Sequence, residues 1–138
     1  MRLRKNAKLE LLKRVPLFAK LSRAELERIS MAADELDFKE GKQLAREGAV
    51  GREFFVIVEG TAEVTRARRK LRTLSDGDFF GEISLITRLP RTATVTTVSP
   101  VRALVITDRS FRRMLADSPA IQRKVLEALG ERLNATVP

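Results

Sequence analysis

The sequence contains no cysteine, no histidine, no tryptophan and no tyrosine. Without cysteine the chain can form neither disulfides nor thiolate metal sites, and a Cys nucleophile is excluded. Without histidine it lacks imidazole zinc ligands and the base of a Ser-His-Asp triad. The carboxylates show no paired-acid arrangement of the kind used in general acid–base catalysis. We therefore expect a protein that is not an enzyme, with no catalytic residues, no metal and no cofactor.

Long apolar runs are missing as well. The N-terminal stretch MRLRKNAKLELLKRVPLF mixes basic residues with leucines, which is unlike a signal peptide. No later run approaches the length of a membrane helix. The expectation is a cytoplasmic protein without a membrane segment, and the cysteine-free composition is compatible with a reducing compartment.

Acidic residues are fewer than basic ones. The chain has 138 residues, with 27 Lys and Arg against 18 Asp and Glu, which gives a net charge of +9. This length allows one domain with a real core, and the charge suits an anionic partner such as nucleic acid, phosphate or a membrane surface. The basic segment RARRKLR, residues 66–72, is either part of an anion-binding patch or, more commonly, a solvated strand edge protected by charge.

Helical patterns occupy both ends of the chain. Leucines before Pro16 predict a short helix that stops ahead of the proline. Ser22 and Glu25 have the spacing of a capping box at the start of a second helix. Near the C-terminus Pro119 suits the first position of a last helix, in which apolar residues step by four along one face, namely Ile121, Val125, Leu129 and Leu133.

The middle of the chain predicts strands. Residues 37–107 are rich in Val, Ile, Thr and Phe and are punctuated by glycines, which is typical of antiparallel strands in a barrel or sandwich. No linker or repeat interrupts the chain. We expect one mainly β domain over residues 1–138, with a helical entry at 5–34, a β-roll or jelly roll at 35–107 and C-terminal helices at 108–135.

The segment GEISLITRLPRTATV, residues 81–95, combines a glycine, an acid and an arginine between strand patterns. A helical turn after Gly81 would present backbone N–H groups to an anion, and Arg91 would give a phosphate a bidentate partner beside the Thr92 hydroxyl. Glu82 would repel a bare phosphate and needs a donor, which a ribose hydroxyl supplies. A sugar phosphate therefore fits better than a simple anion.

A structural role is the alternative for the same residues. An acid in the first turn of a helix is favoured by the helix dipole, and Glu82 could simply pair with Arg91. On the residues alone, both interpretations stay open.

The segments DGDFFGEISLI and PRTATV resemble the phosphate-binding cassette of cyclic nucleotide-binding domains, which occur in cyclic-nucleotide-dependent kinases, cyclic-nucleotide-regulated channels and catabolite-activator-type transcription factors. EGAVGREFFVIVEGTAEV is similar to the strands of that family, and LLKRVPLFAKLSRAELERIS to its helical entry. The resemblance covers nearly the whole chain. It implies an antiparallel β-roll with N-terminal helices and C-terminal lid helices.

The resemblance also implies roles for matching positions. Glu82 would accept the ribose 2′-hydroxyl and Arg91 would pair with the cyclic phosphate. The other phosphate- and ribose-binding positions would be Gly81, Ile83, Ser84, Thr92 and Ala93. The purine would lie among Val64, Leu74 and Val95 from the roll and Leu126, Leu129 and Arg132 from the last helix. Ile83 also matches a pocket position, and for Val64, Leu74, Ile83 and Val95 a place in the core fits nearly as well.

By this resemblance the chain is a regulatory sensor that binds cyclic AMP or cyclic GMP and moves its last helix as a lid. Thr92 is similar to the residue found in several members of the family that accept cyclic GMP, but members that respond to cyclic AMP also tolerate threonine there. Cyclic AMP is the preferred ligand, because no other pocket position clearly favours a guanine edge. No specific DNA reading is expected, and the effector domain or partner protein would lie outside this chain. The alternatives are a basic nucleic-acid-binding domain, which lacks stacking Trp and Tyr, and a scaffold with a non-functional nucleotide pocket.

Overall fold

The computed structural model describes residues 3–136, except for the side chains of residues 83, 86, 129 and 131–136. The chain forms two compact units. The first contains the helices up to Ala32 together with those from Arg109 onward, and the second runs from Ala33 to Asp108.

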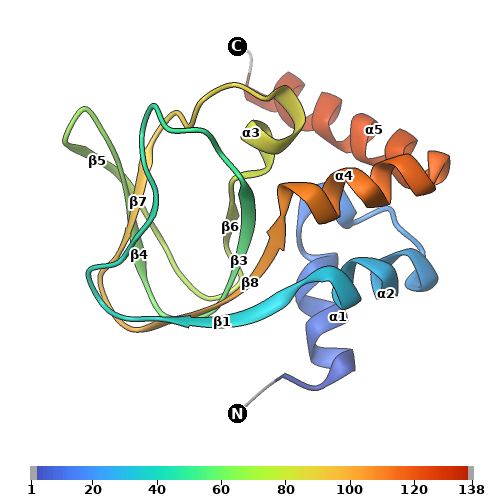
Figure 1. Cartoon of the computed structure of the whole chain (residues 1–138), viewed down its shortest axis with the longest axis horizontal. Coiled ribbons are helices and arrows are strands. Elements are labelled where there is room, and N and C mark those ends of the chain that lie inside the picture. Colours follow the sequence, from blue (N-terminus) through green and yellow to red (C-terminus); the bar gives the residue numbers. More distant parts are fainter. Residues whose placement is uncertain (1–2, 137–138) are drawn as a thin grey trace. The chain divides into compact units, whose positions relative to one another are not determined.

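The second unit is a roll of two four-stranded antiparallel sheets (Figure 1). One sheet has the order β1-β8-β3-β6 and the other β2-β7-β4-β5. Their bounds are Asp34–Phe38 for β1, Gln43–Ala45 for β2, Glu53–Glu59 for β3, Ala62–Arg66 for β4, Arg69–Leu74 for β5, Phe79–Phe80 for β6, Thr94–Thr97 for β7 and Val101–Thr107 for β8. A short helix, α3 (Glu82–Thr87), follows β6.

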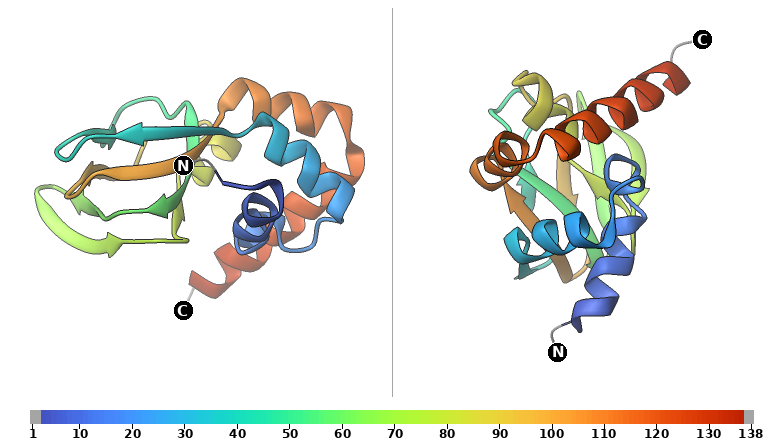
Figure 2. Two further views of the ribbon diagram at one scale, coloured as in Figure 1. Left: turned by 90° about the horizontal axis from the view of Figure 1, so that it is seen from below. Right: turned by 90° about the vertical axis from the view of Figure 1, so that its right-hand side faces the viewer.

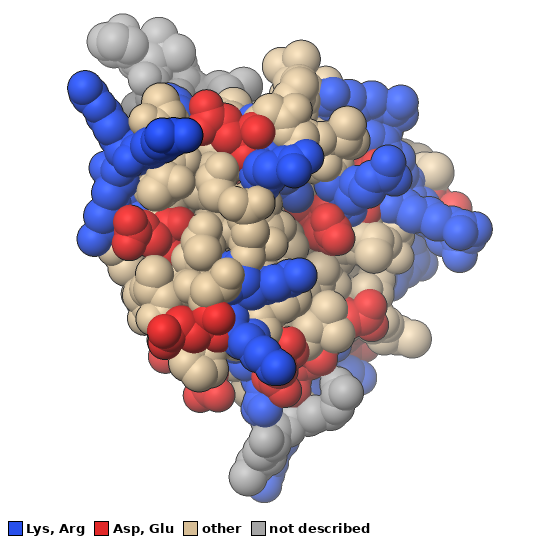
Figure 3. Space-filling view, turned by 60° about the vertical axis from the view of Figure 1, so that its left-hand side comes forward, with Lys and Arg blue, Asp and Glu red and all other residues tan. Residues whose placement is uncertain are grey.

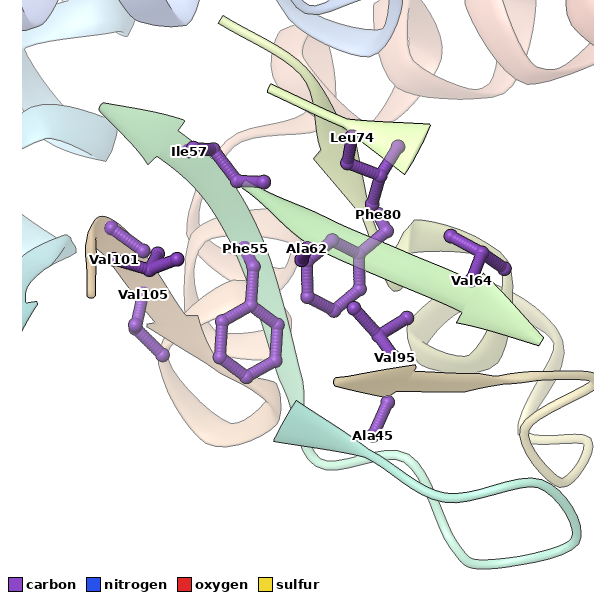
Figure 4. Packing of buried hydrophobic residues seen from close by; sticks show 11 residues of the cluster. Ala45, Phe55, Ile57, Ala62, Val64, Leu74, Phe80, Val95, Val101 and Val105 are labelled. Atoms are coloured by element: carbon purple, nitrogen blue, oxygen red, sulfur yellow. The ribbon is translucent and has the colours of Figure 1, made fainter. Parts of the chain in front are cut away.

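The core of the roll lies between the sheets (Figure 4). Phe55 and Phe80 stack with their ring centroids 4.6 Å apart. In β4, Ala62 and Val64 are buried while their neighbours are more exposed, because successive side chains of a strand point to opposite faces. Alternation thus gives β4 one buried face, whereas in β3 the four consecutive residues from Phe54 to Ile57 are all buried.

The basic segment 66–72 forms the tip of the β4–β5 hairpin. Ala67 and Arg68 both have positive φ, 51° and 67°. A two-residue hairpin loop with both φ values positive matches the right-handed twist of its strands, although residues other than Gly and Asn adopt it at a cost. From Arg66 to Arg72 every residue is exposed, as the solvated-edge interpretation predicts.

The helical unit contains α1 (Lys5–Lys13), the 3₁₀ turn η1 (Pro16–Phe18), α2 (Arg23–Ala32), α4 (Asp108–Asp117) and α5 (Pro119–Thr136). Within it, α1 packs on α2 and η1 packs on α5 (Figure 2). Phe18 and Phe111 meet in its interior with ring centroids 6.4 Å apart. This unit therefore has an apolar interior of its own.

The predicted helix signals are confirmed. Ser22 and Glu25 form the reciprocal capping box. The Ser22 N–H donates to Glu25 Oε1 at 2.8 Å, and the Glu25 N–H donates to Ser22 Oγ at 3.2 Å. Pro119 begins α5, and Ser118 Oγ accepts the N–H of Ile121 at 3.2 Å. Ile121 and Val125 are buried as the stripe predicted. The expected fold class, an antiparallel β-roll with flanking helices, is likewise confirmed.

Candidate functional site

The candidate site is built on the turn between β6 and β7. Gly81 lies between β6 and α3 and has a φ of 101°. Residues other than glycine rarely adopt this backbone conformation. A Cβ here would also lie 2.7 Å from the Glu53 carbonyl oxygen and 2.8 Å from Nη1 of Arg91. The glycine therefore allows the chain to turn tightly against both groups.

Arg91 lies inside this turn and is only 7% exposed. Its Nη1 donates to the Gly81 carbonyl at 3.0 Å and its Nη2 to the Glu53 carbonyl. Burial lowers the pKa of Arg91, while the charges of Glu53 and Glu82 act in the opposite direction. A buried guanidinium is costly without hydrogen-bond partners. The two carbonyls occupy two of its five N–H groups, and the rest of the fork can donate to a ligand.

Gly51 lies against the other side of this arginine. A Cβ at Gly51 would be 2.8 Å from Cζ and Nε of Arg91 and 2.6 Å from Cβ of Ser84. No side chain fits there without displacing the guanidinium or α3. The sequence alone does not predict this role of Gly51, because only the folded chain shows which atoms lie against a glycine.

The backbone of Arg91 is held by the loop between β2 and β3. Arg91 N–H donates to the Ala49 carbonyl at 2.8 Å, and Gly48 N–H donates to the Arg91 carbonyl at 2.8 Å. Both main-chain polar groups of Arg91 are therefore satisfied by one loop, which lies more than forty residues earlier in the chain.

Glu82 and Ser84 lie in α3 and are buried, at 3% and 8% exposure. The predicted helical turn after Gly81 is present, but α3 has only six residues. A helix this short has a small dipole, so attraction for an anion falls mainly on the Arg91 charge. Glu82 interacts within the chain, and its buried Oε2 atom accepts no hydrogen bond from the described side chains or backbone.

A pocket of about 250 Å³ reaches Arg91. It is lined from β2 and the following loop by Gln43, Leu44, Ala45, Arg46, Ala49 and Val50, and beside the arginine by Glu53. Two arginines and one glutamate give its walls a positive balance. Such a pocket can accept a small anion that also carries groups able to donate hydrogen bonds.

The predicted site residues fall into four groups. Gly81, Glu82, Ser84 and Arg91 come together, with Thr92 exposed and Ala93 partly buried next to them. Val64, Leu74 and Val95 pack in the core of the roll, so their part in holding a purine stays a prediction. Leu126 is 56% exposed on α5. The side chains of Ile83, Leu129 and Arg132 lie outside the described residues.

Charge is mixed on the surface. On the face drawn in Figure 3, Lys and Arg side chains are interspersed with acidic and uncharged ones. Among the described side chains of residues 3–136, we find no group of three or more His, Cys, Asp or Glu that could hold a metal ion. None of the helices described has both the length and the apolar character needed to cross a membrane.

Comparison with known proteins adds an independent observation. A family model described as "Cyclic nucleotide-binding domain" matches residues 35–118. The chain is 36% identical over 131 residues to a cAMP-dependent protein kinase regulatory subunit of Mycosarcoma maydis, covering 88% of this chain and 25% of the relative. It is 30% identical over 132 residues to a CRP-like cAMP-activated global transcriptional regulator of Mycobacterium tuberculosis (strain ATCC 25618 / H37Rv), covering 92% of this chain and 59% of the relative.

A solved structure shares the fold. The crystal structure of the N-terminal domain of a transcriptional regulator from Streptomyces coelicolor A3(2) superposes with a TM-score of 0.83 at 28% sequence identity. The match covers 91% of this chain and 94% of that one. The chain thus spans a quarter of the kinase subunit and less than two thirds of the full-length regulator, but nearly all of the excised domain.

Proposed function

This chain belongs to the cyclic nucleotide-binding domain family, and from that premise we propose that it is a sensor of cyclic AMP in which Arg91 holds the cyclic phosphate. Two relatives whose names contain cAMP support cyclic AMP as the first ligand to test. In this proposal Glu82 accepts the ribose 2′-hydroxyl. Gly81 and Ser84 contribute their backbone, and Thr92 and Ala93 lie beside the phosphate.

The observation that carries the proposal is the buried Arg91 guanidinium at the wall of a pocket. A charge removed from water and held by two carbonyls keeps N–H donors in a fixed orientation. The pocket, of about 250 Å³, gives an anion a route to this guanidinium, and Arg46 in its lining adds a second positive charge.

The first prediction concerns Arg91→Ala. Loss of a charge-assisted bidentate pair should weaken cyclic AMP binding by a hundredfold or so, about 2.7 kcal/mol. Arg91→Lys keeps the charge but loses the planar fork, and its affinity should fall between wild type and Arg91→Ala. Isothermal titration calorimetry measures all three proteins.

Arg69→Ala is the matched control, because it removes one positive charge from an exposed position of the same roll. Its affinity for cyclic AMP should stay close to that of wild type. An Arg91→Ala protein that folds and binds cyclic AMP as tightly as wild type would remove Arg91 from the site. A parallel titration with cyclic GMP shows which of the two nucleotides binds more tightly.

The same titrations distinguish cyclic-nucleotide binding from nucleic-acid binding driven by the net charge of +9. A short random duplex binds through counterion release, so its affinity would fall steeply with salt. Cyclic AMP carries a single phosphate charge and should show a much weaker salt dependence. Tight duplex binding with no response to either cyclic nucleotide would replace the proposed function.

The second part of the proposal is that ligand binding repositions α5 as a lid, with Leu126, Leu129 and Arg132 meeting the purine. An exposed leucine on an amphipathic helix supports it. A ligand can shift such an element only if its binding free energy differs between the two arrangements. In most coupled systems this difference is about 1 to 3 kcal/mol. The regulated output would belong to an effector domain or a partner protein.

The absence of tryptophan allows a direct test of the lid. In a Leu126→Trp variant the single indole starts at an exposed position, and cyclic AMP should shift its emission to shorter wavelength. In Leu126→Trp combined with Arg91→Ala the shift should require far more ligand. An emission spectrum that does not change at saturating cyclic AMP would show that α5 does not close over the base.

A further inference from the structure

Three hydrogen bonds tie the β4–β5 hairpin to the segment that carries Arg91. Arg66 Nε donates to the Thr92 carbonyl at 3.0 Å. The Ala67 N–H donates to Oε1 of Glu47 at 3.0 Å. The N–H of Glu47 itself donates to Thr94 Oγ1 at 3.0 Å. Loop, hairpin and cassette therefore meet at Glu47.

These contacts surround the residue that the proposed function depends on. Arg91 is held through its backbone by Gly48 and Ala49, which directly follow Glu47. Thr92 and Thr94 follow Arg91 along the chain and are held by Arg66 and Glu47. The backbone on which the guanidinium is mounted is thus fixed from the loop side and from the hairpin side.

We propose that Glu47 and Arg66 are positioning residues for the cyclic-nucleotide site, joining the basic hairpin to the backbone of the phosphate-binding arginine. The proposal rests on the proposed function. It gives Glu47 and Arg66 a specific task, because they act through directed hydrogen bonds to the hairpin turn and to the cassette and not through the summed charge of residues 66–72.

The hairpin turn fits this role. Ala67 has a φ of 51°, which a residue with a side chain adopts at a cost in free energy. Its N–H donates the hydrogen bond to the Glu47 carboxylate. The bond to Glu47 offsets part of that cost. Cutting it frees the turn and also releases the side chain of Glu47, the residue that directly precedes Gly48 and Ala49 in the loop.

The test compares cyclic AMP affinity and dissociation rate in wild type, Glu47→Ala, Glu47→Gln, Arg66→Ala and Arg66→Lys. Both groups are exposed, so each hydrogen bond contributes modestly, and we expect Glu47→Ala to weaken binding by about threefold to tenfold. Glu47→Gln retains an oxygen acceptor and should bind like wild type. Arg66→Ala should weaken binding about twofold to fivefold, with Arg66→Lys partly restoring it. The loss should appear as faster dissociation.

A double-mutant cycle distinguishes positioning from general loss of structure. If Glu47 acts through Arg91, Glu47→Ala should cost almost nothing further in an Arg91→Ala background. Arg69→Ala is again the charge-matched control and should bind like wild type. Thermal unfolding checks that each variant is folded, and Arg66→Ala, an exposed substitution, keeps the test open if Glu47→Ala does not fold.

The outcomes separate the two claims. The positioning role is overturned if Glu47→Ala and Arg66→Ala bind like wild type while Arg91→Ala does not, and the proposed function then stands. It is also overturned if Arg69→Ala is as weak as Arg66→Ala, which would indicate a charge effect, or if the costs of Glu47→Ala and Arg91→Ala simply add. A wild-type chain that binds no cyclic nucleotide overturns both.

Discussion

At the scale of single residues, the site depends on two positions where a side chain is absent. Gly81 turns the backbone with φ 101° beside Glu53 and Arg91. Gly51 has no such conformational demand, but a Cβ would collide with Arg91 and Ser84. One glycine is needed for its backbone angle and the other for the space it leaves.

Gly51→Ala should therefore impair ligand binding more than folding. The added methyl group must push the guanidinium or α3 by several tenths of an ångström, because real Cβ contacts are never as short as 2.6 Å. We expect affinity for cyclic AMP to fall at least tenfold, or about 1.4 kcal/mol, in a calorimetric titration.

Gly130→Ala makes the same chemical change at a place with open space. Apart from the adjacent residues and the backbone of the helix itself, no heavy atom with a described position lies within 4 Å of the added Cβ, and the position is inside α5. Alanine is favoured over glycine in a helix interior, so this control should gain about 0.5 to 1 kcal/mol of stability and bind normally. Equal affinities for the two alanine variants would contradict the close approach at Gly51.

At the scale of elements, local signals in the sequence predicted the helices well. The Ser22–Glu25 capping box and the start of α5 at Pro119 depend on residues within four positions of each other. The strand alternation in β4 is equally local. Sequence patterns identify such features because the partners are close along the chain.

The contacts that hold Arg91 could not be predicted in this way. The Glu53 carbonyl is 38 positions from the Arg91 guanidinium that donates to it, and Arg66 is 26 positions from the Thr92 carbonyl. Main-chain carbonyls carry no residue-specific signal, and an exposed Glu or Arg looks like any solvated charge. The sequence singled out Arg91 as the expected anion ligand, but it gave no signal for the groups that hold this side chain in place.

A charged pair joins α2 to α5 inside the helical unit. Lys124 Nζ donates to Glu25 Oε1 at 2.8 Å, and this hydrogen bond, with the capping-box bonds, lowers the pKa of Glu25 below its ordinary value of 4.5. A carboxyl with a lowered folded-state pKa binds protons more readily when unfolded. Its contribution to stability is present above pH 4.5 and is lost as the pH falls through the folded-state pKa.

Glu25→Gln isolates this effect, because glutamine keeps a capping acceptor but has no charge. Near neutral pH wild type should be more stable by about 0.5 to 1 kcal/mol, a value limited by solvent screening of the pair. The difference should shrink towards zero as the pH falls below 4.5. Urea denaturation at several pH values measures it, and a difference that grows on acidification would contradict the sign of the pKa shift.

At the scale of the whole molecule, the chain has two compact units, and thermal unfolding with and without ligand tests whether they unfold together. Binding to the folded state at a concentration of a hundred times Kd adds about 2.7 kcal/mol. For a chain of 138 residues this should raise the unfolding midpoint by about 10 °C.

We propose that the chain unfolds as one domain, so a single calorimetric transition should move as a whole. If only one of two transitions moves on adding cyclic AMP, the helical unit and the roll are separate folding units. The Arg91→Ala protein should show almost no shift at the same ligand concentration.

The central claim is that Arg91 holds the phosphate of a cyclic nucleotide at the turn made by Gly81. A crystal structure of the chain with cyclic AMP tests it most directly. The cyclic phosphate should lie within hydrogen-bonding distance of the Arg91 guanidinium, and the ribose 2′-hydroxyl should donate to the Glu82 carboxylate. A nucleotide bound elsewhere, with the Arg91 fork donating only to the carbonyls of Gly81 and Glu53, would contradict it.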